Sequence, residues 1–370
     1  MGTPANGAPR ELASQDSNII SRINEALNVV HSTRSTNEAR REASAYLEEL
    51  KADKTAPFHG FTLASDKAQE PVVRHFALSL LENAIKHFWY DYADREAESM
   101  KGWVLQLSEH ITAADPLYIR NKTAQLWVEV AKRSWGQEWQ DMDQLLVQLW
   151  GTGSVVHKEF VLFVLENLSD EVFSKEDGTV AMREAILSKA CVDIFTPAQV
   201  LQEHFPNRTV EPVLRSGPEG WLVRLSLLLG QCLQQGVNTS DDNRSCALKT
   251  LAVLKSVLPW VTPKAVVFAS CVDHLCQSLA TPNVQIQLVR KSKPQIVGDE
   301  TNTLQAAVEA MHALYSRSHL DKEEFDQLIA PVCTTPRIEL FQQVYQYSIV
   351  DAEDIDDEKY LLCKKFSEVS

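Results

Sequence analysis

The stretch PVVRHFALSLLENAIKHFWY, Pro71–Tyr90, is the strongest helix signal in this 370-residue sequence. Its apolar side chains recur every three or four residues, as on one face of an α-helix: Val72, Val73, Phe76, Leu80, Leu81, Ala84, Ile85 and Phe88. Proline is tolerated in the first turn, because an N–H there would have no partner within the helix. We therefore predict a helix from residue 71 that buries this face and leaves polar residues opposite: His75, Ser79, Glu82, Asn83 and Lys86.

Similar amphipathic segments surround this helix on both sides. Ser17 can cap a helix over 18–32, and Thr36 precedes a second helix over 37–52. The same periodicity predicts further helices at about 93–111, 116–134, 139–150, 153–172, 178–195, 217–235, 241–258, 262–280, 301–316, 321–333 and 336–348. One alternating run, VQIQLV at 284–289, stands alone as a strand signal.

The helices follow each other as pairs. The second helix of each early pair starts near residues 36, 71, 116 and 153, which is the period of HEAT-type two-helix repeats. Such a pair cannot bury its apolar faces alone, so neighbouring pairs stack. We predict an all-α fold, a right-handed α-α superhelix or HEAT-repeat solenoid of the armadillo type. The alternative is a compact helical bundle, which we favour less because so many similar pairs could hardly share one centre.

The charge balance bears on the class of partner. With 50 acidic and 36 basic residues the net charge is −14, whereas a protein that binds duplex nucleic acid through phosphate contacts usually carries a basic field. The whole-chain charge therefore favours basic protein partners. The short basic stretch RKSKPQ, with Arg290, Lys291 and Lys293, gives thin support to an RNA-binding module as an alternative.

The cysteines and the apolar runs indicate the compartment. The seven cysteines include no CxxC pair, and Cys271 and Cys276, with His274 between them, lack a second cluster that could complete a zinc site. We expect buried or partly buried free thiols in a reducing compartment. No run approaches the roughly 18 apolar residues of a membrane span, and the first residues lack an apolar signal core. We expect a soluble intracellular protein.

Motifs for catalysis are absent from the sequence. It contains no GxxxxGK[ST] loop, no GxSxG elbow, no GxGxxG after a strand and no HExxH helix. Paired carboxylates occur, as in LEEL and DKEEFD, but on amphipathic helices they usually form solvated faces. We predict a protein that is not an enzyme, with no catalytic residues, no metal and no cofactor of its own.

Two tryptophans bracket a Gly-Gln-Glu turn at the end of the stretch Asn121–Met142. Trp135 closes one predicted helix and Trp139 starts the next. Large rings on both sides of a tight turn suit a packed joint between two helices. An aromatic cage for a ligand is the less favoured alternative.

Several stretches resemble the nuclear transport receptors of the importin-β superfamily. PVVRHFALSLLENAIKHFW resembles the signature helix of the importin-β N-terminal domain. VEVAKRSWGQEWQDM, followed by EFVLFVLENLSDEVF, resembles the exportin-1-like region that succeeds it, and the detailed pattern is closest to the exportin-five type. DDEKYLLCKKFSE is similar to a segment of fungal-type members. The resemblance is dense from about residue 20 to 175 and thinner from there to 350.

The resemblance implies a division of the chain. Residues 1–15 would be a disordered leader, 16–112 the importin-β N-terminal repeats that bind the GTPase Ran, and 113–350 exportin-1-like repeats. Residues 351–370 would be an acidic loop, at 351–358, and the start of a truncated further repeat. Family members are roughly three times longer, so this chain would be the N-terminal arch. The sequence leaves open whether it is a truncated gene model or a genuine short form.

The resemblance also implies a function and partners. The chain would be a nuclear export receptor that holds Ran in its GTP form and shuttles between nucleus and cytoplasm. Its cargo would be protein, often phosphorylated in fungi, or structured RNA or tRNA, and Phe-Gly nucleoporins would bind its outer surface. GTP would be carried by the partner GTPase. An importer of the same superfamily and a HEAT-repeat scaffold without nucleotide-state sensitivity are the alternatives.

The resemblance places the Ran-binding residues on the second helix of each pair. Carried onto this sequence, the polar residues of three such helices are the candidates, and we expect them on exposed faces: His75, Glu82, Asn83 and Lys86; Arg120, Lys122, Glu129 and Lys132; Lys158, Glu166 and Asp170.

Overall fold

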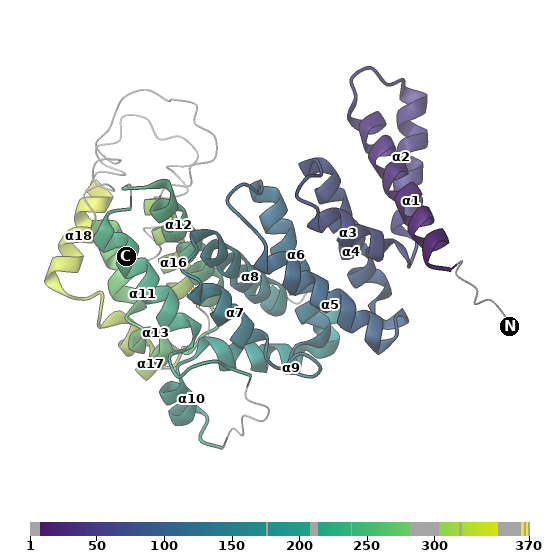
Figure 1. Cartoon of the computed structure of the whole chain (residues 1–370). Helices are drawn as coiled ribbons and strands as arrows, with labels where there is room; N and C mark the ends of the chain where they lie inside the picture. The colour runs from purple at the N-terminus through teal and green to yellow at the C-terminus, as the bar shows by residue number, and fades with distance from the viewer. Residues whose placement is uncertain are drawn as a thin grey trace. The chain divides into compact units, whose positions relative to one another are not determined.

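The computed structural model describes residues 8–174, 177–207, 214–237, 239–280, 303–317, 320–346, 364–365 and 368. Within these ranges the regular elements are helices, apart from one isolated bridge between Trp135 and Trp139 (Figure 1). The predicted all-α, HEAT-repeat class is confirmed. The chain divides into two compact units, residues 1–133 and 134–370, which are described here one at a time.

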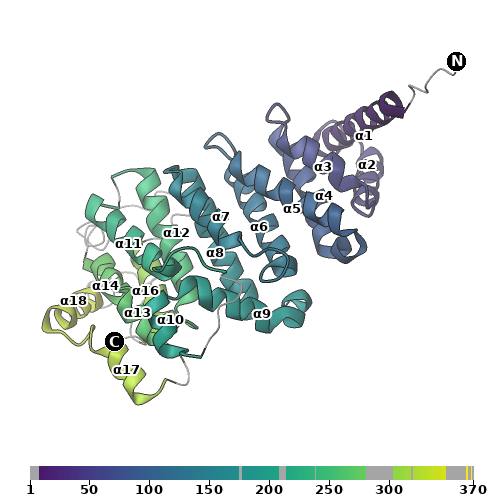
Figure 2. The same cartoon turned by 60° about the horizontal axis from the view of Figure 1, so that its bottom comes forward.

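The first unit consists of helical pairs and the greater part of α6. Its helices are α1 (Ala8–His31), α2 (Asn37–Lys51), α3 (Ala56–Ser65), α4 (Pro71–Phe88), the short 3-10 helix η1 (Trp89–Asp91), α5 (Asp94–Glu109) and α6 (Leu117–Ser134), which ends one residue past the boundary. α1 packs on α2, and α3 on α4 (Figure 2). Most of the predicted apolar face of α4 is buried, with Leu80, Leu81 and Ile85 at most 1% exposed. Val72 lies at its edge and is 38% exposed.

The first helix starts earlier than the sequence predicts. It begins at Ala8, inside the segment expected to be a disordered leader, and the predicted cap Ser17 lies within it. The residues between are mostly good helix formers, such as Glu11, Leu12 and Gln15, and a proline is accepted in a first turn. Helix propensity therefore outweighs the Gly- and Pro-rich composition of the preceding residues.

The second unit contains α7 to α18. The elements are α7 (Met142–Gly151), α8 (Val155–Ser174), α9 (Gly178–Phe195), α10 (Ala198–His204), α11 (Gly220–Gln235), α12 (Asp241–Val257), α13 (Pro263–Phe268), α14 (Cys271–Ala280), α16 (Thr303–Tyr315), α17 (Lys322–Ile329) and α18 (Thr335–Tyr345). α7 packs on α8, α11 on α12, and α14 on α16. The stretch VQIQLV, the basic residues 290–293 and the acidic loop 351–358 lie outside the described residues.

In each unit the second helices of successive pairs lie side by side. α2 packs on α4, and α4 is joined to α6 by side-chain contacts in the first unit. In the second unit α8 packs on α12, and α12 packs on α16. This is the neighbour relation that stacked two-helix repeats produce, because each pair covers the apolar face of the next. The row of second helices carries the candidate residues.

One helix predicted from the sequence is two separate helices in the structure. The sequence predicts a single helix over 262–280, but α13 ends at Phe268 and α14 starts at Cys271. Ser270 between them has φ 53°, in the left-handed region that a continuous α-helix of L-residues does not enter. The break turns the chain between two short helices. The sequence prediction also missed α10, which is only seven residues long.

The tryptophan turn is a packed joint, as predicted. Trp135 is 0% and Trp139 1% exposed, so neither ring lines an open site. The Trp139 N–H donates to the Ser134 carbonyl at 3.0 Å, and Arg183 of α9 donates to the Trp135 carbonyl at 2.7 Å. Gly136 has φ 82°, and a Cβ there would stand 2.7 Å from a methyl carbon of Ile186. The prediction that Trp139 starts the next helix is wrong. Trp139 lies in the turn, three residues before α7 begins at Met142.

The described cysteines are free thiols. Cys191, Cys232, Cys246, Cys271 and Cys276 are buried, as expected, whereas Cys333 is exposed. The described residues contain no group of His, Cys, Asp or Glu side chains that could hold a metal ion. A search of the same residues finds no helix with the length and apolar character needed to cross a membrane.

Candidate functional site

The candidate residues of the first unit meet where α4 and α6 lie side by side. We call this surface the α4–α6 seam and define it by His75, Glu82 and Lys86 of α4 together with Tyr118, Lys122, Glu129, Lys132 and Arg133 of α6. On α4 these residues are seven and four positions apart, so helical geometry places them on one face. α6 brings its own polar residues opposite them.

Glu82 is the central carboxylate on the α4 side of the seam. Its carboxylate accepts a hydrogen bond from Lys86 Nζ at 2.9 Å, one turn along α4, and forms a short ion pair with Lys122 of α6. Burial acts to raise the pKa of Glu82, but the hydrogen bonds from Lys122 and Lys86 outweigh it and lower the pKa. Glu82 is therefore ionised at neutral pH and ties the two helices together.

Glu129 is the central carboxylate on the α6 side of the seam and is buried. It accepts hydrogen bonds from Lys132 Nζ at 2.9 Å and Arg133 Nη1 at 2.8 Å, and Lys86 Nζ lies 3.6 Å away. Arg133 Nη2 also donates to the Lys86 carbonyl at 3.1 Å. The cations can be buried here because the carboxylate neutralises them and accepts their hydrogen bonds.

This burial corrects the sequence-based expectation for two residues. Glu129 is 2% and Lys132 1% exposed, so they do not lie on an exposed face. The sequence shows which residues share one face of α6, but not that another helix covers that face. Their place among the Ran-binding candidates stays a prediction, and any such role would be to position Lys86 rather than to touch a partner.

The remaining candidates of this unit differ in accessibility. The rings of His75 and Tyr118 meet edge to face, with centroids 5.5 Å apart. Burial lowers the pKa of His75, and the nearby charge of Lys122 lowers it further, so this imidazole is neutral near pH 7. Asn83 faces α2 and donates to the Lys51 carbonyl at 2.7 Å, where it satisfies an end-of-helix acceptor. Arg120 is partly buried.

An accessible edge remains beside the buried charges. The Lys86 side chain is 35% exposed, and Tyr118 is 49% exposed. Leu117, at 50%, and Val72, at 38%, lie on the first turns of α6 and α4. Aromatic and apolar groups next to paired charges are the composition of a protein-binding surface.

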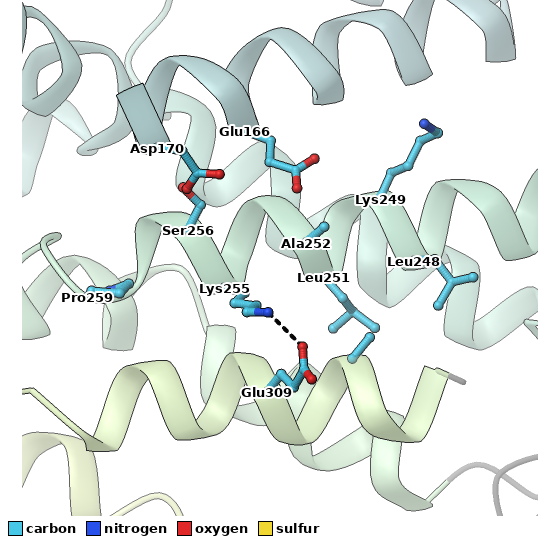
Figure 3. Close-up of a pocket in the computed structure, with 11 residues that line it drawn as sticks. Glu166, Asp170, Leu248, Lys249, Leu251, Ala252, Lys255, Ser256, Pro259 and Glu309 are labelled. Atoms are coloured by element: carbon cyan, nitrogen blue, oxygen red, sulfur yellow. Dashed lines mark hydrogen bonds and ion pairs between the residues drawn. The ribbon is translucent and has the colours of Figure 1, made fainter. Parts of the chain in front are cut away.

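The candidates of the second unit lie on α8. Lys158 places its Nζ 5.9 Å from the centre of the Trp150 ring, two helical turns before Glu166. Glu166 and Asp170 are one turn apart and line a cleft of about 630 Å³ between α8, α12 and α16 (Figure 3). The structure thus brings two of the three candidates together, and Lys158 is not among the residues that line this cleft.

The other residues that line the cleft were not predicted from the sequence. Lys249, Lys255 and Ser256 come from α12, and Glu309 comes from α16. Lys255 Nζ and a Glu309 oxygen are 2.7 Å apart, and Lys365 Nζ lies 2.9 Å from the other Glu309 oxygen. About 80 residues separate α8 from α12 here, and three helices intervene in the chain, so no spacing in the sequence signals this neighbourhood.

Comparisons with known proteins show what the chain is similar to. Residues 116–205, which include α6 to α10, match the family described as Exportin 1-like protein. Protein MSN5 of Saccharomyces cerevisiae is 28% identical over 368 residues, which is 95% of this chain and 28% of the yeast protein. Exportin-5 of Dictyostelium discoideum is 32% identical over 132 residues, 35% of this chain and 12% of that protein.

A further match supports the same family. Exportin-5 of Homo sapiens is 32% identical over 153 residues, which is 40% of this chain and 12% of the human protein. The chain is therefore similar to receptors of the exportin-5 type in the importin-β superfamily, over about two-fifths of its length or less. The match to the yeast relative is nearly continuous along the chain, yet the chain spans only about a quarter of that relative and less of the others.

Proposed function

We propose that this chain acts in nuclear export, as a transport receptor or the part of one that binds Ran in its GTP form. The proposal is supported by the exportin names among its relatives and the Exportin 1-like match over residues 116–205. The chain would carry protein cargo, phosphorylated or not, or structured RNA, and would contact Phe-Gly nucleoporins as it passes between nucleus and cytoplasm.

The single observation that carries the site is the accessible edge of the α4–α6 seam. Tyr118 and Lys86 project from second helices, with the Tyr118 ring against His75 and Lys86 paired with Glu82. A tyrosine supplies a large contact area at low entropic cost, and tyrosine is enriched among the residues that dominate binding energy. The Lys122–Glu82 ion pair and the hydrogen bond from Arg133 to the Lys86 carbonyl join α4 to α6 and would hold Lys86 in place for a partner.

The mechanism requires no chemistry from this chain. Hydrolysis of GTP would belong to the GTPase, and the receptor would respond to the nucleotide through the partner's shape. In an exporter, binding of the GTP form and of cargo favour each other, and this coupling is reciprocal by thermodynamic necessity. The net charge of −14 would speed the encounter with a partner of basic surface.

The test is calorimetry of the purified chain with Ran in a GTP-locked form and in the GDP form. We expect binding of the GTP form only. Tyr118→Ala should weaken it roughly tenfold and Lys86→Gln a few-fold, because the first removes a hot-spot ring and the second a charge at the rim.

Matched controls lie in the same unit. Tyr90→Ala removes a tyrosine that is 66% exposed on η1, and Arg95→Gln removes an exposed cation on α5. Neither should change the affinity. Equal affinity for both nucleotide forms would instead favour a scaffold, and release of cargo by the GTP form would favour an importer.

A further inference from the structure

The cleft between α8, α12 and α16 contains a carboxylate that nothing described in the chain neutralises. Glu166 extends from α8 at the cleft, between Asp170 and Lys249 (Figure 3). Within the described residues Glu166 accepts no hydrogen bond and forms no ion pair, and only more distant charges act on it. A half-buried carboxylate without such a partner is costly, and sites of this kind are often completed by a ligand.

The other charges of the cleft are already engaged. Lys255 and Lys365 both pair with Glu309, and Lys249 holds its Nζ 5.9 Å from the centre of the Phe163 ring. Asp170 accepts a short hydrogen bond from the Ser256 hydroxyl. Lys249 forms no ion pair within the described residues and acts on Glu166 only at longer range. The carboxylate that remains unpaired on α8 is that of Glu166.

The size and the apolar lining of the cleft favour a cation at the end of a long, mostly apolar side chain. The volume of about 630 Å³ is in the range that holds a short peptide segment rather than a lone ion. Leu248, Leu251, Ala252 and Ala306 line it with apolar surface. Arginine and lysine side chains lay such stems along apolar surface and keep the charged end near polar groups.

We propose that this cleft binds an arginine side chain on an extended segment of a protein partner, with Glu166 and Asp170 as its acceptors. The two residues are one helical turn apart, with about 5–6 Å between Cβ atoms at that spacing. A guanidinium has five N–H donors in a planar fork, so it can serve two neighbouring carboxylates where an ammonium serves them less well. The biological source of the segment, a protein partner, rests on the proposed function.

The test uses fluorescence anisotropy with the full chain and a labelled Gly-Ala peptide that carries one central arginine. Its twin carries citrulline, which has the same shape without the charge. We expect the arginine peptide to bind and the citrulline twin to lose most of the affinity. Glu166→Gln and Asp170→Asn should each weaken the arginine peptide roughly tenfold, the change expected when one charge-assisted hydrogen bond is lost.

The control separates the cleft from the overall negative field. Glu138→Gln combined with Asp141→Asn removes two exposed carboxylates of the same unit, outside the cleft. This double variant should leave the affinity within about a factor of two at physiological salt, where exposed charges are screened. Equal weakening by the control would overturn the proposal, as would tighter binding of a phosphoserine twin or no binding of the arginine peptide.

A pH series gives a second, independent readout. Burial raises the pKa of Glu166, and the neighbouring charge of Asp170 raises it further, against Lys249 and Lys255 of α12. Glu309 of α16 is held ionised by its two lysines. Affinity for the arginine peptide should fall as pH drops and Glu166 takes up a proton, and this dependence should be lost in Glu166→Gln.

The peptide assay contains no GTPase. A chain that binds the peptide but not Ran retains the cleft and loses the proposed function, and the reverse result removes the cleft alone.

Discussion

The α4–α6 seam and the cleft on α8 hold the same kinds of residue at the same place in a helical row, with opposite outcomes. In the seam, Glu82 pairs with Lys86 of its own helix and Lys122 of α6. Glu129 pairs with Lys132 and Arg133 of its own helix and lies 3.6 Å from Lys86 of α4. In the cleft, Glu166 binds no cation within the described residues. The structure separates charges that hold the fold from a charge that is free to recognise a partner.

The difference comes from which cations lie within reach of each carboxylate. In the seam, Lys132 and Arg133 follow Glu129 by one turn on the same helix, and Lys122 of α6 reaches Glu82 of α4. Opposite Glu166, α12 supplies Lys249 and Lys255, but Lys249 forms no ion pair with Glu166, and Glu309 of α16 engages Lys255. The third helix in the row therefore takes one of the two possible counter-charges. Substitutions at Glu129, Glu82, Asp115 and Glu166 test this difference.

The largest effect is expected at the buried end of the seam. Glu129→Gln keeps the size of the side chain but removes the charge that neutralises Lys132 and Arg133, which are almost fully buried. Breaking a buried ion pair from one side is strongly destabilising, so we expect a loss of about 3 kcal/mol in the free energy of unfolding. Urea unfolding, with hydrogen exchange of the α4 and α6 amides, measures it.

The matched variant is Glu82→Gln, in the same seam. Its partners Lys86 and Lys122 are 35% and 16% exposed, against 1% and 3% for Lys132 and Arg133, so water reaches more of the charge that is left behind. We expect a smaller loss, of about 1 kcal/mol. Equal losses for the two variants would contradict the distinction between the buried end and the accessible edge.

Asp115 offers an intermediate effect with a defined pH dependence. It is 3% exposed and accepts hydrogen bonds from Arg74 at 2.6 Å and Lys67 at 2.7 Å. Burial acts to raise its pKa, but these two hydrogen bonds and that of the Thr112 N–H outweigh it and lower the pKa to about 2. Because the folded pKa lies below the unfolded one, the stabilisation is complete above about pH 4 and is lost as pH falls towards 2.

Asp115→Asn should therefore cost stability at neutral pH and little in acid. Since Lys67 is 43% exposed and its charge is screened, we expect a loss of about 1–2 kcal/mol at pH 7. The gap between variant and wild type should close near pH 2. Unfolding by urea at a series of pH values measures this, and a gap that is independent of pH would show that Asp115 acts by its shape alone.

Most of the fold follows from the sequence because helical periodicity is a local property. Most of the predicted face of α4 is buried, although Val72 is exposed and Ala77 and Leu78 join the buried face. α5, α6, α8 and α9 begin within about two residues of their predicted starts. The failures are also local but concern rarer conformations. Ser270 at positive φ divides one predicted helix into α13 and α14, and no residue type at that position signals it.

For the candidate site, the sequence predicts only which residues share a face of a helix. Periodicity places Glu129 and Lys132 on a polar face of α6, but their burial depends on what covers that face. The cleft depends on α12 and α16, which are far away in the sequence. Tyr118 is visible in the sequence as an aromatic residue in the first turn of a second helix, but its exposure depends on the packing of that helix.

The smallest expected effect is the most discriminating, because its sign is opposite to the others. Burial and the charge of Asp170 raise the pKa of Glu166, so the ionised carboxylate costs the folded chain stability at neutral pH. Glu166→Gln should therefore raise the free energy of unfolding, by about 1 kcal/mol or less, as removal of an uncompensated charge from a binding site commonly does. The gain should shrink as pH falls, since a raised pKa means that wild-type Glu166 takes up its proton at a higher pH in the folded chain than in the unfolded one. Thermal unfolding of both proteins at pH 7.5 and at pH 5 measures it, with Glu309→Gln as the control that loses stability at neutral pH because Glu309 is paired. A destabilised Glu166→Gln would show that this carboxylate serves the fold, like those of the seam, and the contrast between the two regions would fail.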